Sequence, residues 1–213
     1  MENKTSTKGK FITIEGCEGS GKTRQINMLR DRLESLGVDY VATREPGGTG
    51  ISEKIRNILL DGKNREMDDV CEALLYAAAR VQHINEVILP ALKEGKLVIC
   101  DRYIDSSFAY QGYARGLGYD FIREINRFAI ERCMPDATVF LNLSPEDAFK
   151  RKGGADAGDR VEMSGKQFHD KVYGGYLELV KMFPERIIDV DCRGTKEETS
   201  DKIFSALKAV KII

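Results

Sequence analysis

Short runs of apolar residues alternate with longer amphipathic stretches along the chain of 213 residues. Each run is rich in Val, Ile or Phe, which is typical of strands buried on both faces of a parallel sheet. We therefore predict buried strands at residues 11–15, 40–43, 97–100, 138–141 and 187–190.

Between these runs, apolar residues recur at the spacing of amphipathic helices. Positions 26, 29, 33 and 36 fall on one helical face, and Gly37 is expected to end that helix. Pro90 lies inside a long, largely apolar pattern at residues 70–93, where it predicts a kink or a break. Further helices are predicted at residues 51–60, 119–132, 164–182 and 196–210.

Strands that alternate with helices over the whole length predict an α/β fold of three layers, in which helices flank a parallel sheet of about five strands. The crossovers are expected to be right-handed, whereas the order of the strands does not follow from the pattern. We expect residues 10–213 to form a single domain and residues 1–9 to be a flexible N-terminal segment.

Composition and charge narrow the classes of partner. The 33 basic and 34 acidic residues give a net charge of -1, which predicts no general attraction to nucleic acids or to anionic membranes. No uninterrupted apolar stretch approaches the roughly 20 residues that span a bilayer. The five cysteines are odd in number and none forms a C-x-x-C pair, which argues against a disulfide framework or a zinc site. We expect a reducing, cytoplasmic location.

The segment after the first predicted strand reads GCEGSGKT and matches the phosphate-binding pattern G-x-x-x-x-G-K-[ST]. Its glycines let successive backbone N–H groups surround an anion, and the following helix adds the positive end of its dipole. Lys22 is expected to reach the β- and γ-phosphates of ATP, and Thr23 to offer its hydroxyl to Mg²⁺. The predicted ATP-binding residues are Gly16, Cys17, Glu18, Gly19, Ser20, Gly21, Lys22 and Thr23.

Nucleotide binding alone also fits a GTPase or a motor protein. The chain lacks the N-K-x-D motif that reads guanine, and a motor would normally be longer, which leaves a small nucleotide-handling kinase. Such a kinase needs a cationic clamp for the acceptor phosphate, an acid near the metal, and mobile positive charge that closes over the transferred group.

Three segments offer these features. Asp101 and Arg102 follow the third strand, on the ligand side of an open α/β sheet, where Asp101 is expected to bind Mg²⁺ partly through water and Arg102 a phosphate. Arg44 precedes a Pro-Gly-Gly turn after the second strand. A basic, glycine-punctuated segment at about 150–162 is interpreted as a lid, with Arg151 preferred over Arg160 as its catalytic cation. Taken singly, these segments also fit a structural ion pair, a surface turn and a solvated loop.

Five motifs occur together and in order: IEGCEGSGKT from residue 14, TREPGGT from residue 43, YAAAR from residue 76, DRYIDSSFAYQG from residue 101 and DRVE from residue 159. In this combination the chain resembles the thymidylate kinases. The resemblance implies the fold of P-loop nucleoside monophosphate kinases, transfer of the γ-phosphoryl group of ATP to dTMP with Mg²⁺ to give dTDP for dTTP synthesis, and a homodimer.

The resemblance also implies individual roles. Tyr76 falls where the family stacks an aromatic ring, mostly Phe, on thymine, and Arg80 where it binds the thymine O4. Tyr110 falls where the family crowds the 2′ position of the sugar. The predicted dTMP-binding residues are Glu18 (at the 3′-hydroxyl), Arg44 and Arg102 (at the monophosphate), Pro46, Tyr76, Arg80, Ser107, Tyr110 and Gln111.

Two further expectations concern catalysis and its neighbourhood. The phosphate loop lacks the arginine that some thymidylate kinases place there, so the lid is expected to supply the catalytic cation beside Lys22 and Arg102. His83, on the same predicted helix as Arg80, is interpreted as a bystander. A kinase for another monophosphate or for a deoxynucleoside, and a nucleotide-binding regulator without transfer, stay open as alternatives.

Overall fold

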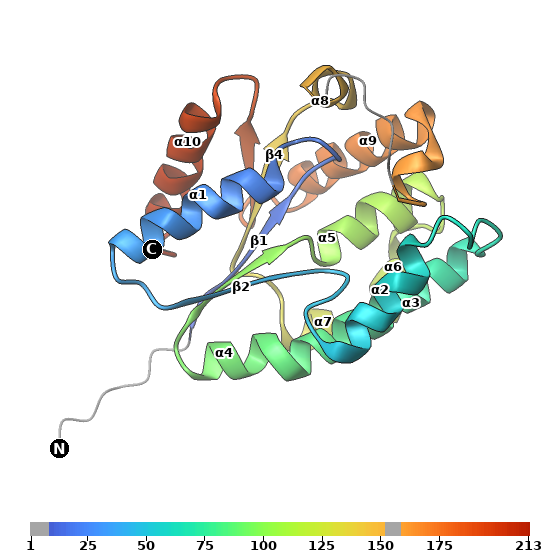
Figure 1. Ribbon diagram of the computed structural model, residues 1–213, viewed down its shortest axis with the longest axis horizontal. Helices are drawn as coiled ribbons and strands as arrows, with labels where there is room; N and C mark the ends of the chain where they lie inside the picture. Colours follow the sequence, from blue (N-terminus) through green and yellow to red (C-terminus); the bar gives the residue numbers. More distant parts are fainter. Residues whose placement is uncertain (1–8, 152–158) are drawn as a thin grey trace.

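The computed structural model describes residues 9–151 and 159–213 (Figure 1). Most of the predicted N-terminal segment and the middle of the predicted lid therefore lie outside the described residues. Within them, five parallel strands form one sheet in the order β2-β3-β1-β4-β5, which confirms the predicted fold class. The strands are β1 (Phe11–Glu15), β2 (Tyr40–Arg44), β3 (Leu97–Asp101), β4 (Ala137–Asn142) and β5 (Ile187–Asp191).

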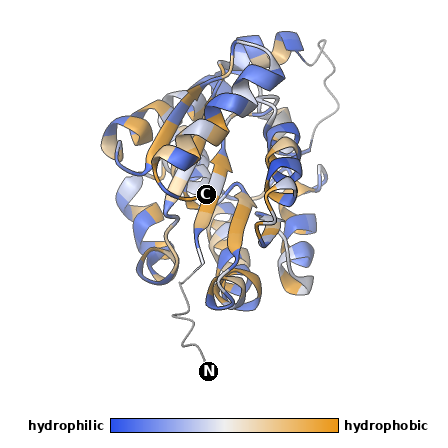
Figure 2. Ribbon diagram, turned by 90° about the vertical axis from the view of Figure 1, so that its left-hand side faces the viewer, coloured by the Kyte–Doolittle hydropathy of each residue, from blue (hydrophilic) through white to orange (hydrophobic). Residues whose placement is uncertain are grey.

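Two apolar cores lie on opposite faces of this sheet. One face packs against α1 (Lys22–Ser35) and α10 (Lys196–Ala209), which lie side by side in Figure 1. Successive residues of β1 serve different cores, Phe11 on one face and Ile12 on the other. Because both faces are covered, the central strands β1, β3 and β4 are buried along almost their whole length. The edge strands β2 and β5 are partly exposed, so the prediction of a buried strand at 40–43 is wrong in that respect. Figure 2 shows strand segments between layers of helices.

The opposite face carries the helices that build the site. They are α3 (Asp69–His83), α4 (Leu89–Lys93), α5 (Ile104–Ser107) and α9 (Lys166–Met182), with α2 (Gly50–Leu60) packed on α3. A short helix α8 (Pro145–Arg151) follows β4. None of the helices in the described part of the chain is long and apolar enough to cross a membrane.

The predicted break near Pro90 takes the form of a π-helical segment, Ile84–Ile88, between α3 and α4. The backbone N–H of Leu89 bonds to the carbonyl of Ile84, five residues back. Proline has no N–H and its ring collides with the preceding turn of an α-helix, so the widened turn carries the chain past Pro90 without ending the helix.

The prediction of one helix at 119–132 is wrong in one respect. The segment is divided at Asn126 into two helices, α6 (Tyr119–Ile125) and α7 (Arg127–Arg132). The Asn126 side chain donates to the carbonyl of Ile122 and accepts from the guanidinium of Arg80. These bonds stabilise an interruption that the apolar spacing could not indicate. A second π-helical segment, Phe108–Ala114, was likewise not predicted, and it carries Tyr110 and Gln111.

Candidate active site

A cavity of about 510 Å³ opens where β1, β2 and β3 end, since its wall includes Glu18, in the loop after β1, together with Arg44 and Glu45 at the end of β2 and Asp101 and Arg102 at the end of β3. This is the edge at which open α/β sheets bind ligands. The structure brings most of the predicted site residues to this wall: Glu18, Gly19, Gly21, Lys22, Thr23, Arg44, Pro46, Tyr76, Arg80, Asp101, Arg102, Ser107, Tyr110 and Gln111.

A second cavity, of about 450 Å³, lies on the other side of the phosphate loop. Gly19 and Gly21 line both cavities, Ser20 lines the second, and the opposite wall of the second comes from the start of α10 and from Cys192 and Gly194. The loop is therefore a partition between two spaces.

The phosphate loop owes its shape to glycine at specific positions. Gly16 has a φ of 151°, and a Cβ there would approach the Ser20 Oγ to 2.8 Å and the Leu141 carbonyl oxygen to 3.1 Å. The Lys22 ammonium donates to the carbonyl oxygens of Gly16 and Cys17, each at 3.1 Å. Burial, followed by the charge of Arg102, lowers the pKa of Lys22 to about 8. Burial raises the pKa of the Cys17 thiol to about 11, which keeps that thiol protonated.

Arg102 joins the phosphate loop to the far wall of the larger cavity. Its backbone adopts the left-handed conformation, with a φ of 66°, which is uncommon outside glycine. Its Nη1 donates to the Gly16 carbonyl oxygen at 3.1 Å, its Nη2 lies 3.4 Å from the Glu18 carboxylate, and its guanidinium lies 5.1 Å from the centre of the Tyr110 ring.

Glu15, which sequence reasoning did not assign to the site, supports this arginine. Its fully buried carboxylate accepts from the Tyr103 backbone N–H at 2.7 Å, the Ser106 hydroxyl at 2.6 Å and the Tyr176 hydroxyl at 2.7 Å. Ser106 and Tyr176 also accept from the Arg102 Nη1, at 3.3 and 3.4 Å. Glu15 thus fixes the groups on which Arg102 rests.

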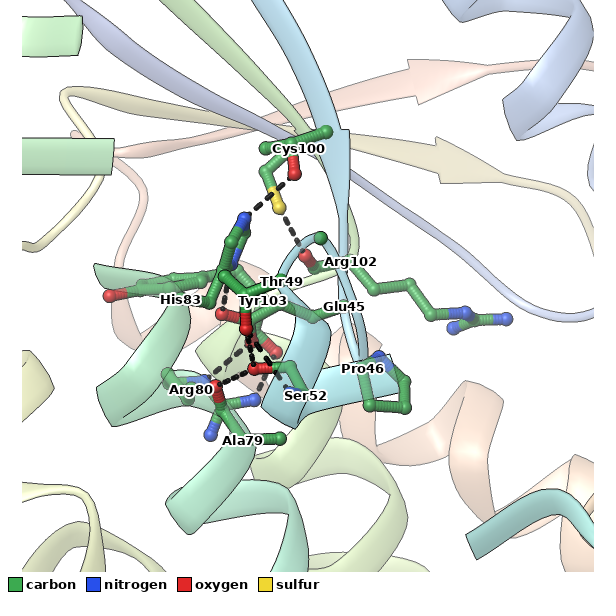
Figure 3. A network of polar contacts seen from close by, with 12 residues as sticks. Glu45, Pro46, Thr49, Ser52, Ala79, Arg80, His83, Cys100, Arg102 and Tyr103 are labelled. Atoms are coloured by element: carbon green, nitrogen blue, oxygen red, sulfur yellow. Dashed lines mark hydrogen bonds and ion pairs between the residues drawn. The ribbon is translucent and has the colours of Figure 1, made fainter. Parts of the chain in front are cut away.

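A buried polar network joins β2 to α3 (Figure 3). The Glu45 carboxylate accepts from the Arg80 Nε at 2.7 Å and lies 2.9 Å from the His83 Nδ1. The His83 Nε2 lies 2.7 Å from the Thr43 hydroxyl. His83, interpreted as a bystander, is not among the residues that line the larger cavity, but its fully buried ring connects two elements that form it. In Figure 3 the side chain of Arg102 extends away from this network.

Arg80 has more protein partners than its predicted role requires. Besides Glu45, its guanidinium donates to the Asn126 side-chain oxygen and to the Tyr103 carbonyl oxygen at 3.1 Å. Arg80 lines the larger cavity with only 1% of its surface exposed. It ties α3 to the ends of β2 and β3, in addition to any bond that it donates to a ligand.

The two predicted lid arginines lie apart from Lys22 and from each other. Arg151 lines the second cavity and donates to the carbonyl oxygens of Cys192 and Gly194. Arg160 is buried against the end of α2, donating to the Leu59 carbonyl oxygen and the Glu72 carboxylate. In this structure neither side chain is among those that line the cavity with Lys22.

The oxygen ligands of the larger cavity fit a magnesium ion. Asp101 and Thr23 both line it, and the Asp101 Oδ1 is buried without a hydrogen-bond partner among the described residues. A buried, unpaired carboxylate oxygen is costly unless a cation compensates it, and Mg²⁺ takes few protein ligands beside substrate phosphates and water.

Comparison with known proteins now decides the family. The sequence model described as thymidylate kinase matches residues 14–203. The chain belongs to the thymidylate kinase family. The thymidylate kinase of Clostridium novyi (strain NT) is 47% identical over 203 residues, which are 94% of this chain and 97% of that protein. The thymidylate kinase of Oceanobacillus iheyensis is 50% identical over 205 residues, 93% and 91% of the two chains.

A solved thymidylate kinase shares the fold. The crystal structure of the Ehrlichia chaffeensis enzyme is 32% identical in sequence, has a TM-score of 0.76 and covers 95% of this chain and 99% of its own. The segments that carry the resemblance to thymidylate kinases, although far apart in the sequence, meet around the larger cavity. Glu15, Glu45, Glu72, His83, Asn126 and Tyr176 were missed because their partners come from distant elements.

Glu15 predicts a pH dependence of stability. Burial, followed by the charge of Asp105, raises the pKa of its carboxyl from 4.5 to about 7. A carboxyl whose pKa is higher in the folded state contributes stability that is complete below the unfolded pKa and is lost as the pH rises through about 7. Between about pH 5 and pH 8, wild type should lose roughly 3 kcal/mol relative to Glu15→Gln.

Urea unfolding of both proteins across this pH range measures the difference. A gap that stays constant from about pH 5 to about pH 8 would contradict the raised pKa.

Proposed function

We propose that this protein is a dTMP kinase, which transfers the γ-phosphoryl group of ATP to dTMP and releases dTDP and ADP. The observation that carries the proposal is the position of Arg102, in a member of the thymidylate kinase family. Its guanidinium contacts the phosphate loop at Gly16 and Glu18 and lies over Tyr110 on the far wall. One cation can therefore serve donor and acceptor phosphates together.

The donor side is built around the phosphate loop. Lys22 would turn from the Gly16 and Cys17 carbonyls to the ATP phosphates, whose negative charge favours its protonated form. The second cavity, between the loop and the start of α10, is of a size to take the nucleoside part of ATP. Mg²⁺, when bound with ATP, would neutralise phosphate charge, and Thr23 and Asp101 would hold it, Asp101 partly through water.

The acceptor side lies on α3 and the π-helical segment. Tyr76 offers a ring face for thymine, Gln111 and Ser107 lie at the base edge, and Tyr110 crowds the 2′ position of the sugar. Arg44, on the same wall, would bind the monophosphate, and Glu18 the 3′-hydroxyl. Arg80 would donate to the thymine O4 with an N–H that its protein partners leave over, since a guanidinium has five.

Transfer would be direct and in line, because an oxygen of dTMP can attack the γ-phosphorus without a covalent enzyme intermediate. Positioning and charge neutralisation then supply the catalysis. Lys22 and Arg102 share the developing charge. The chain would form a single domain of residues 10–213 with a lid at about 150–162, and this lid would supply a further cation. For Arg151 to be that cation, its side chain must leave the carbonyls of Cys192 and Gly194.

The experiment that tests the function is an ADP-release assay with ATP and Mg²⁺ over a panel of acceptors: dTMP, dUMP, dCMP, AMP and UMP. The proposal requires dTMP to have the highest kcat/KM. A different preferred acceptor would support the alternative of another monophosphate kinase. Equal rates over the panel, or none, would overturn the kinase function and favour a regulator.

We further propose a cytoplasmic homodimer that packs through α2 and α3. Apolar side chains are exposed along one stripe of each helix: Ile51 and Ile58 on α2, and Val70, Leu74 and Val81 on α3. Their spacings of seven, four and eleven residues place the members of each stripe on one helical face. The two helices pack against each other, and we take their exposed stripes together as the apolar patch of this interface.

Leu74→Asp should convert the dimer to a monomer, because Leu74 is 49% exposed near the middle of this patch and a charge there would be buried on association. Size-exclusion chromatography with light scattering measures the mass. Val210→Asp is a matched control, since Val210 is 47% exposed at the end of α10. A wild-type monomer, or a dimer that survives Leu74→Asp, would contradict this interface.

A further inference from the structure

Glu72 is a buried carboxylate beside the larger cavity, on α3 and one helical turn before Tyr76. Its Oε2 accepts from the Arg160 Nη2 and, at 3.1 Å, from the Arg115 Nη2. Its Oε1 accepts from the Gln111 Nε2 at 2.9 Å and more weakly from the Arg115 Nε at 3.3 Å. Burial raises the pKa of Glu72, but the bond from Gln111 and the charges of the arginines outweigh it, and the pKa lies below its ordinary value.

An ionised carboxylate can only accept hydrogen bonds. Glu72 therefore forces the Gln111 carboxamide into one of its two orientations, with the NH₂ group toward Glu72. The Gln111 Oε1 then points away from that carboxylate, and no described residue donates to it, although Gln111 lines the cavity and is almost fully buried. The Gln111 Oε1 is thus a hydrogen-bond acceptor for the cavity, and Glu72 fixes its orientation through the NH₂ group.

We propose that Glu72 determines which base the acceptor site takes, by holding the Gln111 carboxamide with its oxygen toward the base. The inference rests on the proposed function and deepens it. The N3 of thymine or uracil carries a hydrogen and can donate to this oxygen. The N3 of cytosine carries a lone pair, which would face the same oxygen and be repelled. Glu72 is a positioning residue, since it acts on the base through Gln111.

The Glu72→Gln variant would reverse this selection. Arginines only donate, so Arg115 and Arg160 would keep the oxygen of the new carboxamide at the Oε2 position. The NH₂ group of the carboxamide at position 72 would then face Gln111. To accept a hydrogen bond from it, Gln111 must turn its own oxygen toward position 72. The NH₂ group of Gln111 would consequently point into the cavity, where it repels thymine N3–H and can donate to cytosine N3.

The test measures kcat/KM for dTMP and for dCMP in wild type and Glu72→Gln. The ratio of the two values should fall at least tenfold, because one hydrogen bond is lost with dTMP while one is gained with dCMP, each worth about a factor of ten. The KM for ATP should stay near its wild-type value. Loss of folding alone would lower kcat/KM for dTMP and for dCMP in parallel and leave their ratio unchanged. A folded Glu72→Gln protein with an unchanged ratio would therefore overturn the inference.

Arg115→Gln is the matched control. It removes charged donors from Glu72 but leaves the carboxylate facing Gln111, so the ratio should stay at its wild-type value. Should Glu72→Gln not fold, Glu72→Asp keeps the charge facing the arginines and withdraws it from Gln111 by one methylene. The ratio should then fall as well, and an unchanged ratio would overturn the inference.

Wild type also permits a measurement without substitution. In protein labelled with ¹⁵N-glutamine, the Gln111 carboxamide protons should exchange slowly with solvent in the absence of nucleotide, since Glu72 holds them, and fast exchange would overturn the inference. Failure of the proposed function is distinct. Wild type would then not prefer dTMP in the acceptor panel, whereas failure of this inference leaves that preference in place and the Glu72 variants unchanged.

Discussion

Arg102→Ala should lower kcat for phosphoryl transfer from ATP to dTMP by about 10³-fold or more. Arginines that neutralise the charge of a transferring phosphoryl group are worth this much or more in related phosphotransferases. Arg102 lies between the phosphate loop and Tyr110 on the far wall of the larger cavity, on supports fixed by Glu15. No other described residue joins the two sides in this way.

The same substitution should leave the protein folded. The Arg102 side chain is 19% exposed, and its removal leaves Glu15 with its bonds from Tyr103, Ser106 and Tyr176. Steady-state kinetics and a thermal melt separate the two effects. Arg102→Lys should recover only part of kcat, because an ammonium cannot reproduce the planar fork of a guanidinium.

Arg44→Ala provides the contrast. Its guanidinium is half exposed and paired with Glu53 at the rim of the cavity, so its loss should mainly raise the KM for dTMP. If kcat falls less than about tenfold in Arg102→Ala, Arg102 does not stabilise the transition state. Its role would then be substrate binding, as expected for Arg44.

Arg80→Ala should lower the free energy of unfolding by about 3–5 kcal/mol, which is the cost of leaving one partner of a buried ion pair unpaired. The side chains of Arg80 and Glu45 are 2% and 3% exposed, and the Asn126 and Tyr103 acceptors also lose their donor. Urea unfolding measures the loss. We expect the KM for dTMP to rise as well, because Arg80 lines the larger cavity, which is the proposed acceptor site.

Two controls isolate the buried pair. Arg193→Ala removes an exposed arginine that is paired with Asp191, and should leave the free energy of unfolding close to that of wild type. In the double variant Arg80→Ala with Glu45→Ala, the losses should be clearly less than additive, since no unpaired buried charge remains. An Arg80→Ala protein as stable as wild type, with only its KM for dTMP raised, would restore the purely ligand-binding role that the resemblance implies.

The large part of the fold that could be predicted follows from local chemistry. Five apolar runs predicted the five strands nearly to the residue, since the central strands β1, β3 and β4 are buried on both faces and must be largely apolar. Glycines at the phosphate loop and at Gly37 adopt backbone conformations that other residues resist, and these segments were predicted in place. The break at Asn126 was not predictable, because a hydrogen bond to Arg80 on a distant element stabilises it, and the apolar pattern did not indicate the π-helical form of Ile84–Ile88 and Phe108–Ala114.

The amino-acid sequence by itself determined the class of fold, the phosphate loop and the family, because each depends on residue types at fixed spacing along the chain. The tertiary structure decided the order of the strands and the partners of the buried charges. It assigned Arg80 to Glu45, Arg160 to Glu72 and Glu15 to the supports of Arg102. Burial makes a charge depend on whichever partner the fold brings within reach, and spacing along the chain does not encode that partner.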